Sequence, residues 1–180
     1  MAITTNNPIK SASLQTLFSK CNHVYFEEIV TGSGLTQAAI TTGVDFDTEL
    51  PVLDGSLSMN MGDISKTEIK LIDSTIWTSK STKGDSNITM QVSSMAKSIV
   101  KLYMTEGTTI PDTQISGQNF SGQGYVLDVK KSLGAIMLTD DTDSVVIILP
   151  NVEMSGSLNV GDGDNPSYFN VSVTPKPNAD

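Results

Sequence analysis

The chain of 180 residues contains no arginine, one cysteine, one histidine and few aromatic residues. A lone cysteine excludes an internal disulfide, and with it an extracellular fold held together by disulfides. A single histidine argues against acid–base catalysis, for which histidine is the commonest residue. No apolar run approaches the roughly 20 residues that span a bilayer, and the first residues lack a secretion signal. We therefore expect a cytoplasmic product without a membrane anchor.

The charges that are present are mostly negative. All 11 basic residues are lysines, against 20 acidic residues, so the formal net charge is -9. A protein that grips nucleic acid neutralises phosphates with clustered lysine or arginine, and arginine is best suited to bind phosphate through two parallel hydrogen bonds. The composition thus argues against tight binding to DNA or to an anionic membrane. A simpler meaning of the acidity is solubility.

Alternation of apolar and polar residues is the dominant pattern of the chain. Residues 57–61 and 152–160 alternate strictly, and side chains of a strand point alternately to opposite faces, so each segment predicts a strand with one buried face. Residues 145–149 have no polar side chain, so we expect that strand to be covered on both faces. Residues 105–124 are polar and rich in glycine, and we interpret them as a long connection. Further strands are predicted at 24–30, 67–73, 86–92, 124–129, 134–139 and 168–174.

One segment has a clear helical pattern, at about residues 93–105. Its apolar residues recur at helical spacing: Met95, Ile99, Leu102 and Tyr103. Ser93 and Ser94 are candidate N-caps, and Gly107 is well placed to end the helix. A weaker helical pattern at residues 11–21 suggests a short N-terminal helix.

Together these patterns predict one mainly β domain over residues 1–180. We expect a small antiparallel β-sandwich or a barrel-like pair of sheets, with the helix packed across an edge or open end. An N-terminal arm covers about residues 1–22. Residues 62–83 are polar and turn-rich at their centre, which predicts a long protruding loop or hairpin.

No residue set in the sequence carries convincing chemistry. Cys21 and His23 lie two residues apart, but a zinc site needs about four ligands and a cysteine nucleophile needs a third, orienting group. Residues 162–165 look like a calcium loop, yet Ser167 and Val173 stand where that loop needs glycine and glutamate. We expect no catalytic residues, no metal and no cofactor.

Three carboxylates at two-residue spacing form a candidate acidic surface: Asp45, Asp47 and Glu49. In an extended chain this spacing puts all three on one face. A solvated loop is the simplest explanation. The functional alternative is a negative surface to which a passing molecule does not adhere.

Two segments carry a likeness to a known family. Residues 50–68, LPVLDGSLSMNMGDISKTE, and residues 83–92, KGDSNITMQV, together with the helix that follows, resemble the major tail tube proteins of tailed bacteriophages. Residues 124–160 are similar to the second half of the same sandwich. The likeness covers about residues 50–160 and lies in pattern more than in any invariant motif.

The resemblance implies a virion protein that forms hexameric rings stacked into a tail tube, through which viral DNA passes without tight binding. Assembly takes place in the cytoplasm of the bacterial host, and other tail proteins are expected partners. The long loop 62–83 would reach a neighbouring subunit or ring. Its candidate contact residues are Asp63, Lys66, Glu68, Trp77, Lys80 and Lys83.

Two other functions remain open at this stage. The same fold family includes the inner tubes of phage-derived secretion devices. A β-sandwich that binds glycans or acts as an adhesin is the other alternative, against which stand the missing export signal and a single tryptophan, Trp77.

Overall fold

The computed structural model describes residues 18, 20–29, 33–115, 117–141, 145–162 and 166–178. The predicted mainly β class is confirmed, because strands account for 57% of the described residues and helices for 8%, and the sheets are antiparallel. Most of the predicted helix at 11–21 and of the arm at 1–22 lies outside the described residues, as does the centre of the loop at 162–165. Cys21 is described and belongs to a strand, so the helical prediction is wrong at that residue.

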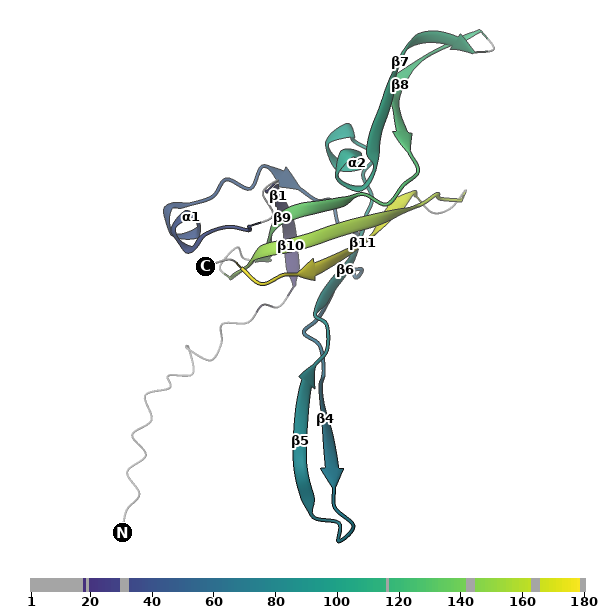
Figure 1. The fold of residues 1–180 in the computed structure, drawn as a ribbon. Helices are drawn as coiled ribbons and strands as arrows, with labels where there is room; N and C mark the ends of the chain where they lie inside the picture. The colour runs from purple at the N-terminus through teal and green to yellow at the C-terminus, as the bar shows by residue number, and fades with distance from the viewer. Residues whose placement is uncertain are drawn as a thin grey trace.

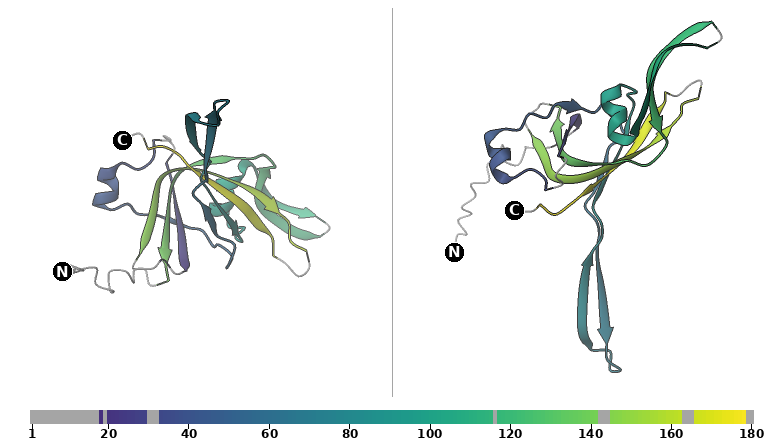
Figure 2. Two further views of the ribbon diagram at one scale, coloured as in Figure 1. Left: turned by 90° about the horizontal axis from the view of Figure 1, so that it is seen from below. Right: turned by 45° about the horizontal axis from the view of Figure 1, so that its top comes forward.

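A seven-stranded antiparallel sheet forms the body of the molecule (Figure 1). The strand order is β2-β1-β9-β10-β11-β6-β3. Figure 2 shows these strands splayed by a strong twist. Their bounds in chain order are β1 (Cys21–Glu28), β2 (Thr48–Glu49), β3 (Ser58–Asn60), β6 (Asn87–Val92), β9 (Lys131–Asp140), β10 (Val146–Asn159) and β11 (Tyr168–Pro175).

The segment between β2 and β3 joins the two ends of this sheet. At one end the amide of Leu50 donates to the carbonyl of Val24 in β1 over 2.8 Å. At the other end the amide of Leu53 donates to the carbonyl of Gln91 in β6 over 2.8 Å, beside an isolated bridge from Val52. The body is therefore barrel-like, with one sheet closed by a crossing segment in place of two packed sheets.

The core lies on the inner face of the sheet. The alternation in residues 86–92 correctly predicted a half-buried strand, since Ile88, Met90 and Val92 are at most 2% exposed. They meet the equally buried face of the neighbouring strand β11, where Val171 is paired with Met90. This face of β6 and β11 therefore forms part of the hydrophobic core inside the barrel.

Helix α2 (Lys97–Tyr103) falls within the predicted range 93–105 and packs on β9 and β10. The helix begins later than expected from the candidate caps Ser93 and Ser94. The Ser94 hydroxyl accepts a hydrogen bond from the amide of Ala96, and Ala96 itself is extended and is the N-cap. The predicted stop at Gly107 is wrong, since the helix ends at Tyr103, Met104 is its extended C-cap, and Gly107 belongs to the following strand. A second helix, α1 (Gln37–Thr42), was not predicted from the sequence.

Two long hairpins leave the body in opposite directions (Figure 1). The first, β4 (Ile64–Lys70) with β5 (Ile76–Lys83), is the predicted protrusion at 62–83. The second, β7 (Thr105–Ile115) with β8 (Gln118–Val126), shows that the connection predicted at 105–124 is wrong. Its sequence lacks alternation because the described side chains are almost all exposed on both faces, so neither face needs apolar residues.

Two burial predictions are also wrong. The strand at 145–149 is not covered on both faces, because Val146 is 47% exposed and its neighbours are only partly buried. In residues 57–61, Met59 and Met61 are 42% and 73% exposed, since β3 lies at the end of the sheet beside the hairpin base. Alternation identifies which side chains share a face, and contacts from elsewhere decide whether that face is covered.

Candidate assembly interface

The β4–β5 hairpin has no core of its own. The strands pair from Ile64 opposite Lys83 to Lys70 opposite Ile76, and every side chain of β5 is exposed. In β4 only Glu68 is partly buried, in an ion pair with Lys66 at 2.8 Å. An isolated two-stranded hairpin is at best marginally stable in water, so this element is suited to bind another surface.

The turn at the end of the hairpin is held by a compact set of hydrogen bonds. The Asp73 carboxylate accepts from the Thr75 amide at 3.0 Å and from its hydroxyl at 2.6 Å. These bonds lower the pKa of Asp73, so its carboxylate is ionised at neutral pH. Ser74 adopts a φ of 66°, and its amide donates to the Leu71 carbonyl over 2.9 Å. The turn therefore presents one fixed negative charge.

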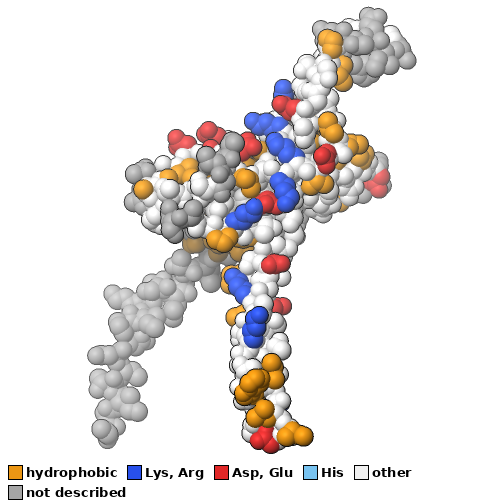
Figure 3. All heavy atoms as spheres, viewed as in Figure 1, with side chains coloured by type: hydrophobic (Ala, Val, Ile, Leu, Met, Phe, Trp, Pro, Cys, Tyr) orange, Lys and Arg blue, Asp and Glu red, His pale blue; other side chains and the backbone are white. Residues whose placement is uncertain are grey.

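Four large apolar side chains surround that turn, and we call them the apolar tip: Leu71, Ile72, Ile76 and Trp77. Ile72 is fully exposed and Trp77 is 68% exposed. Figure 3 shows the orange side chains gathered at the far end of the hairpin. Trp77 is the extra residue of a bulge, since Lys70 pairs with Ile76 and Ile69 with Thr78, and bulges redirect side chains.

The base of the hairpin is a close backbone crossing. Gly62 has a φ of 77°, and a Cβ atom there would lie 2.3 Å from the carbonyl oxygen of Gly84. The Gly84 amide donates to the carbonyl of Asp63 over 2.7 Å. Only glycine fits at position 62 without strain, so the backbone crossing at the hairpin base requires glycine there.

A cavity of about 370 Å³ lies beside this crossing, and we call it the base pocket. Lys83 is the one charged residue among those described that line it, and it forms no ion pair with another described residue. Its apolar wall is formed by Met59, Met61, Ile64, Ile88, Leu149 and Pro175.

The six candidate contact residues from the sequence all lie on this hairpin or at its base. Asp63 and Lys83 are at the base, Lys66, Glu68 and Lys80 along the strands, and Trp77 at the tip. Sequence reasoning missed Ile72 and Met61, which are more exposed than Trp77. The available signal was a pair of large apolar residues on each side of a polar turn.

The candidate acidic surface lies on the segment that leads into β2 and on β2 itself. Asp45, Asp47 and Glu49 are exposed and alternate with partly buried residues. Glu49 lies 2.6 Å from Nδ1 of His23, which ties β2 to β1.

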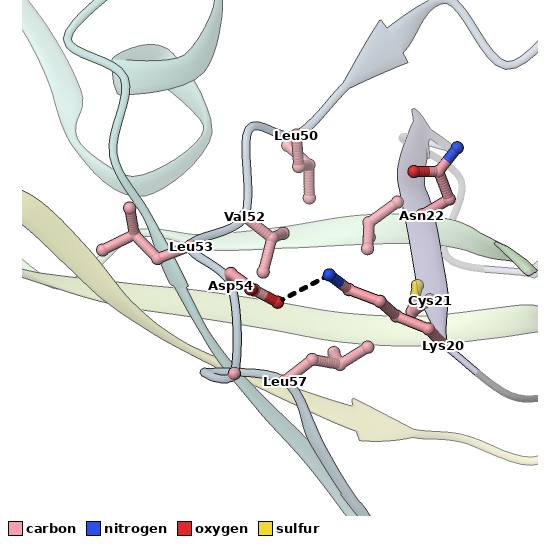
Figure 4. A pocket seen from close by; sticks show the side chains of 10 residues that line it. Lys20, Cys21, Asn22, Leu50, Val52, Leu53, Asp54 and Leu57 are labelled. Atoms are coloured by element: carbon pink, nitrogen blue, oxygen red, sulfur yellow. Dashed lines mark ion pairs between the residues drawn. The ribbon is translucent and has the colours of Figure 1, made fainter. Parts of the chain in front are cut away.

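A second cavity, of about 390 Å³, lies between β1 and residues 50–57 (Figure 4). Lys20 and Asp54 form an ion pair across it at 3.1 Å. Cys21 also lines it, and burial raises the pKa of its thiol, which disfavours the reactive thiolate. The Cys21 thiol donates to the backbone oxygen of His23, so the two side chains form no dyad.

In the described part of the chain, no group of three or more potential ligands lies close enough together to hold a metal ion. No helix among these residues has the length and apolarity needed to span a membrane. Comparisons with protein-family models, curated proteins and solved structures find no match.

Proposed function

We propose that this protein is a structural subunit that assembles with copies of itself into stacked, hexameric rings, and that these rings form the tail tube of a bacteriophage. The exposed apolar tip of the β4–β5 hairpin is the observation that carries the proposal. Exposed contiguous apolar patches on a folded protein mark interaction sites. Ring number, the virion location and contacts with other tail proteins come from the family resemblance.

The energetics favour a hairpin that is completed by a neighbour. Burying a large apolar side chain is worth about 1.5–3 kcal/mol, and the tip has four of them. In a monomer that free energy is not gained, because the tip touches no part of the core. Docking against another copy would supply the covering layer that the isolated hairpin lacks.

The charge of the chain fits a conduit for DNA. With a net charge of -9 and no arginine, the subunit has little capacity to hold phosphates. A wall that binds DNA weakly lets the polymer slide, whereas clustered cations would retain it. The same composition suits the inner tube of a secretion device, and the genes beside this one would distinguish the two.

Electron microscopy of the purified protein tests the proposal. We expect rings or tubes with sixfold symmetry in negative stain at high protein concentration. A variant in which a short turn replaces residues 63–83 should keep its thermal unfolding midpoint but fail to form tubes. Uniform monomers of the unaltered chain at high concentration would contradict the proposed function.

A further inference from the structure

The tip needs a receptor surface, and the structure contains a candidate. We propose that the apolar tip of one copy inserts into the base pocket of a second copy of this chain. This inference rests on the proposed function, since it names the contact by which copies join. It commits to the second copy as the occupant of the pocket.

The two surfaces match in chemistry. The tip presents aliphatic side chains and one indole, and the pocket wall consists of methionine, aliphatic and proline side chains. Its volume of about 370 Å³ falls in the range of about 300–1,000 Å³ that pockets for small ligands occupy. Methionine adapts to irregular apolar shapes, which suits Met59 and Met61 to a receptor wall.

The two surfaces also match in charge. The tip has one fixed carboxylate, that of Asp73, and the described pocket lining has one cation, that of Lys83. Lys83 has no ion-pair partner among the described residues. An incoming tip would bring the Asp73 carboxylate to a cation that no described residue of its own chain pairs with, which sets the orientation of docking.

The contact is possible only between copies. β4 has 7 residues, and at about 3.3 Å per residue the strand separates tip from base by about 23 Å. A hairpin of that length cannot fold its tip back onto its own base. Each copy therefore offers one tip and one pocket at opposite ends of one element, which makes a head-to-tail contact that propagates.

A mixing experiment tests this pairing. The tip variant has Ile72→Asp and Trp77→Asp, and the pocket variant has Met61→Asp. All three side chains are exposed, so the body should fold as before. As controls, Thr67→Asp, an exposed mid-hairpin change, matches the one charge that the pocket variant adds, and Thr67→Asp with Ser81→Asp matches the two charges of the tip variant. Circular dichroism and thermal unfolding verify the fold of each variant, and light scattering after size exclusion measures assembly.

We expect each of the two variants to need at least about tenfold more protein than the control to form stacks. The tip variant keeps an unaltered base pocket, and the pocket variant keeps an unaltered apolar tip. The mixture should therefore give assemblies twice the size of the unit that either variant forms alone, and no larger. A chain of contacts stops there, because the remaining tip and the remaining pocket are both blocked.

The outcomes separate the two proposals. Stacking of the pocket variant at the concentration of the control would overturn the tip-to-pocket pairing and leave the tube function standing. Failure of both variants without growth on mixing would also overturn it, because tip and pocket would then bind different surfaces or a different protein. If the unaltered chain stays monomeric, the proposed function fails and the pairing fails with it.

Discussion

Gly156 lies in β10 beneath the Tyr103 ring, where a Cβ atom would come within 2.7 Å of ring Cδ1. The ring is fully buried and also lies 4.9 Å from that of Phe169, so it has little room to move. We expect Gly156→Ala to lower the free energy of unfolding by about 1–3 kcal/mol through overpacking. Urea unfolding measures this. Gly122→Ala, at a strand glycine with open space around it, should change stability little.

Glu153 lies between two lysines. Its carboxylate is 2.6 Å from Nζ of Lys131 and also pairs with Lys176, and hydrogen bonds from both lower its pKa. Because the pKa of Glu153 is lower in the folded state than in the unfolded state, its ion pairs stabilise the fold at pH values above the unfolded pKa of 4.5. This stabilisation is lost as the pH falls through the pKa of the folded state.

Glu153→Gln should therefore reduce stability at pH 7 by up to about 1 kcal/mol, with the difference disappearing in acid. Thermal unfolding of both proteins across acidic to neutral pH measures it. Glu28→Gln, which removes an exposed carboxylate without an ion pair among the described residues, is the control. A difference that stays constant with pH would show that the two lysines do not act through the charge of Glu153.

At the scale of elements, the β4–β5 hairpin sets the distance between copies if its tip docks at the base of the next. Deleting Lys66 and Thr67 with their partners Lys80 and Ser81 keeps the alternation of faces and shortens the hairpin by two residue pairs. We expect the axial repeat of the tube to shrink by about 7 Å, at about 3.3 Å per residue. Electron microscopy with helical averaging measures the repeat. An unchanged repeat would mean that other surfaces determine the stacking.

The two hairpins also show what the sequence could and could not predict. Residues 86–92 and the apolar residues of α2 were recognisable because one face of each is buried by the body. The sequence did not predict the β7–β8 hairpin, because almost all of its described side chains are exposed on both faces. Neither face packs on a core, so apolar and polar residues do not alternate along these strands. For the candidate site, the sequence identified the charged residues of the hairpin. It could not identify the base pocket, because residues far apart in the chain, such as Met61 and Pro175, line it together only in the folded structure.

At the scale of the whole molecule, every copy carries a net charge of -9, so assembled copies repel each other. Raising NaCl from about 0.1 M to about 1 M shortens the screening length from about 10 Å to about 3 Å. We expect the protein concentration needed for assembly to fall as salt rises, which sedimentation measures. A variant with Asp45→Asn and Asp47→Asn should need less salt. Assembly that weakens with salt would mean that attraction between charges dominates the contacts.

The closure of the body has a consequence during synthesis. β1 lies between β2 and β9, so its pairing with β9 is completed only after residue 140 has left the ribosome. The β4–β5 hairpin pairs only with itself, and local contacts of this kind form quickly. A nascent chain therefore contains both strands of this hairpin, with its apolar tip, before β9 and β10 can complete the body. During that interval the apolar tip and the unpaired strand edges of the body are exposed together, and such partly folded chains are prone to aggregate.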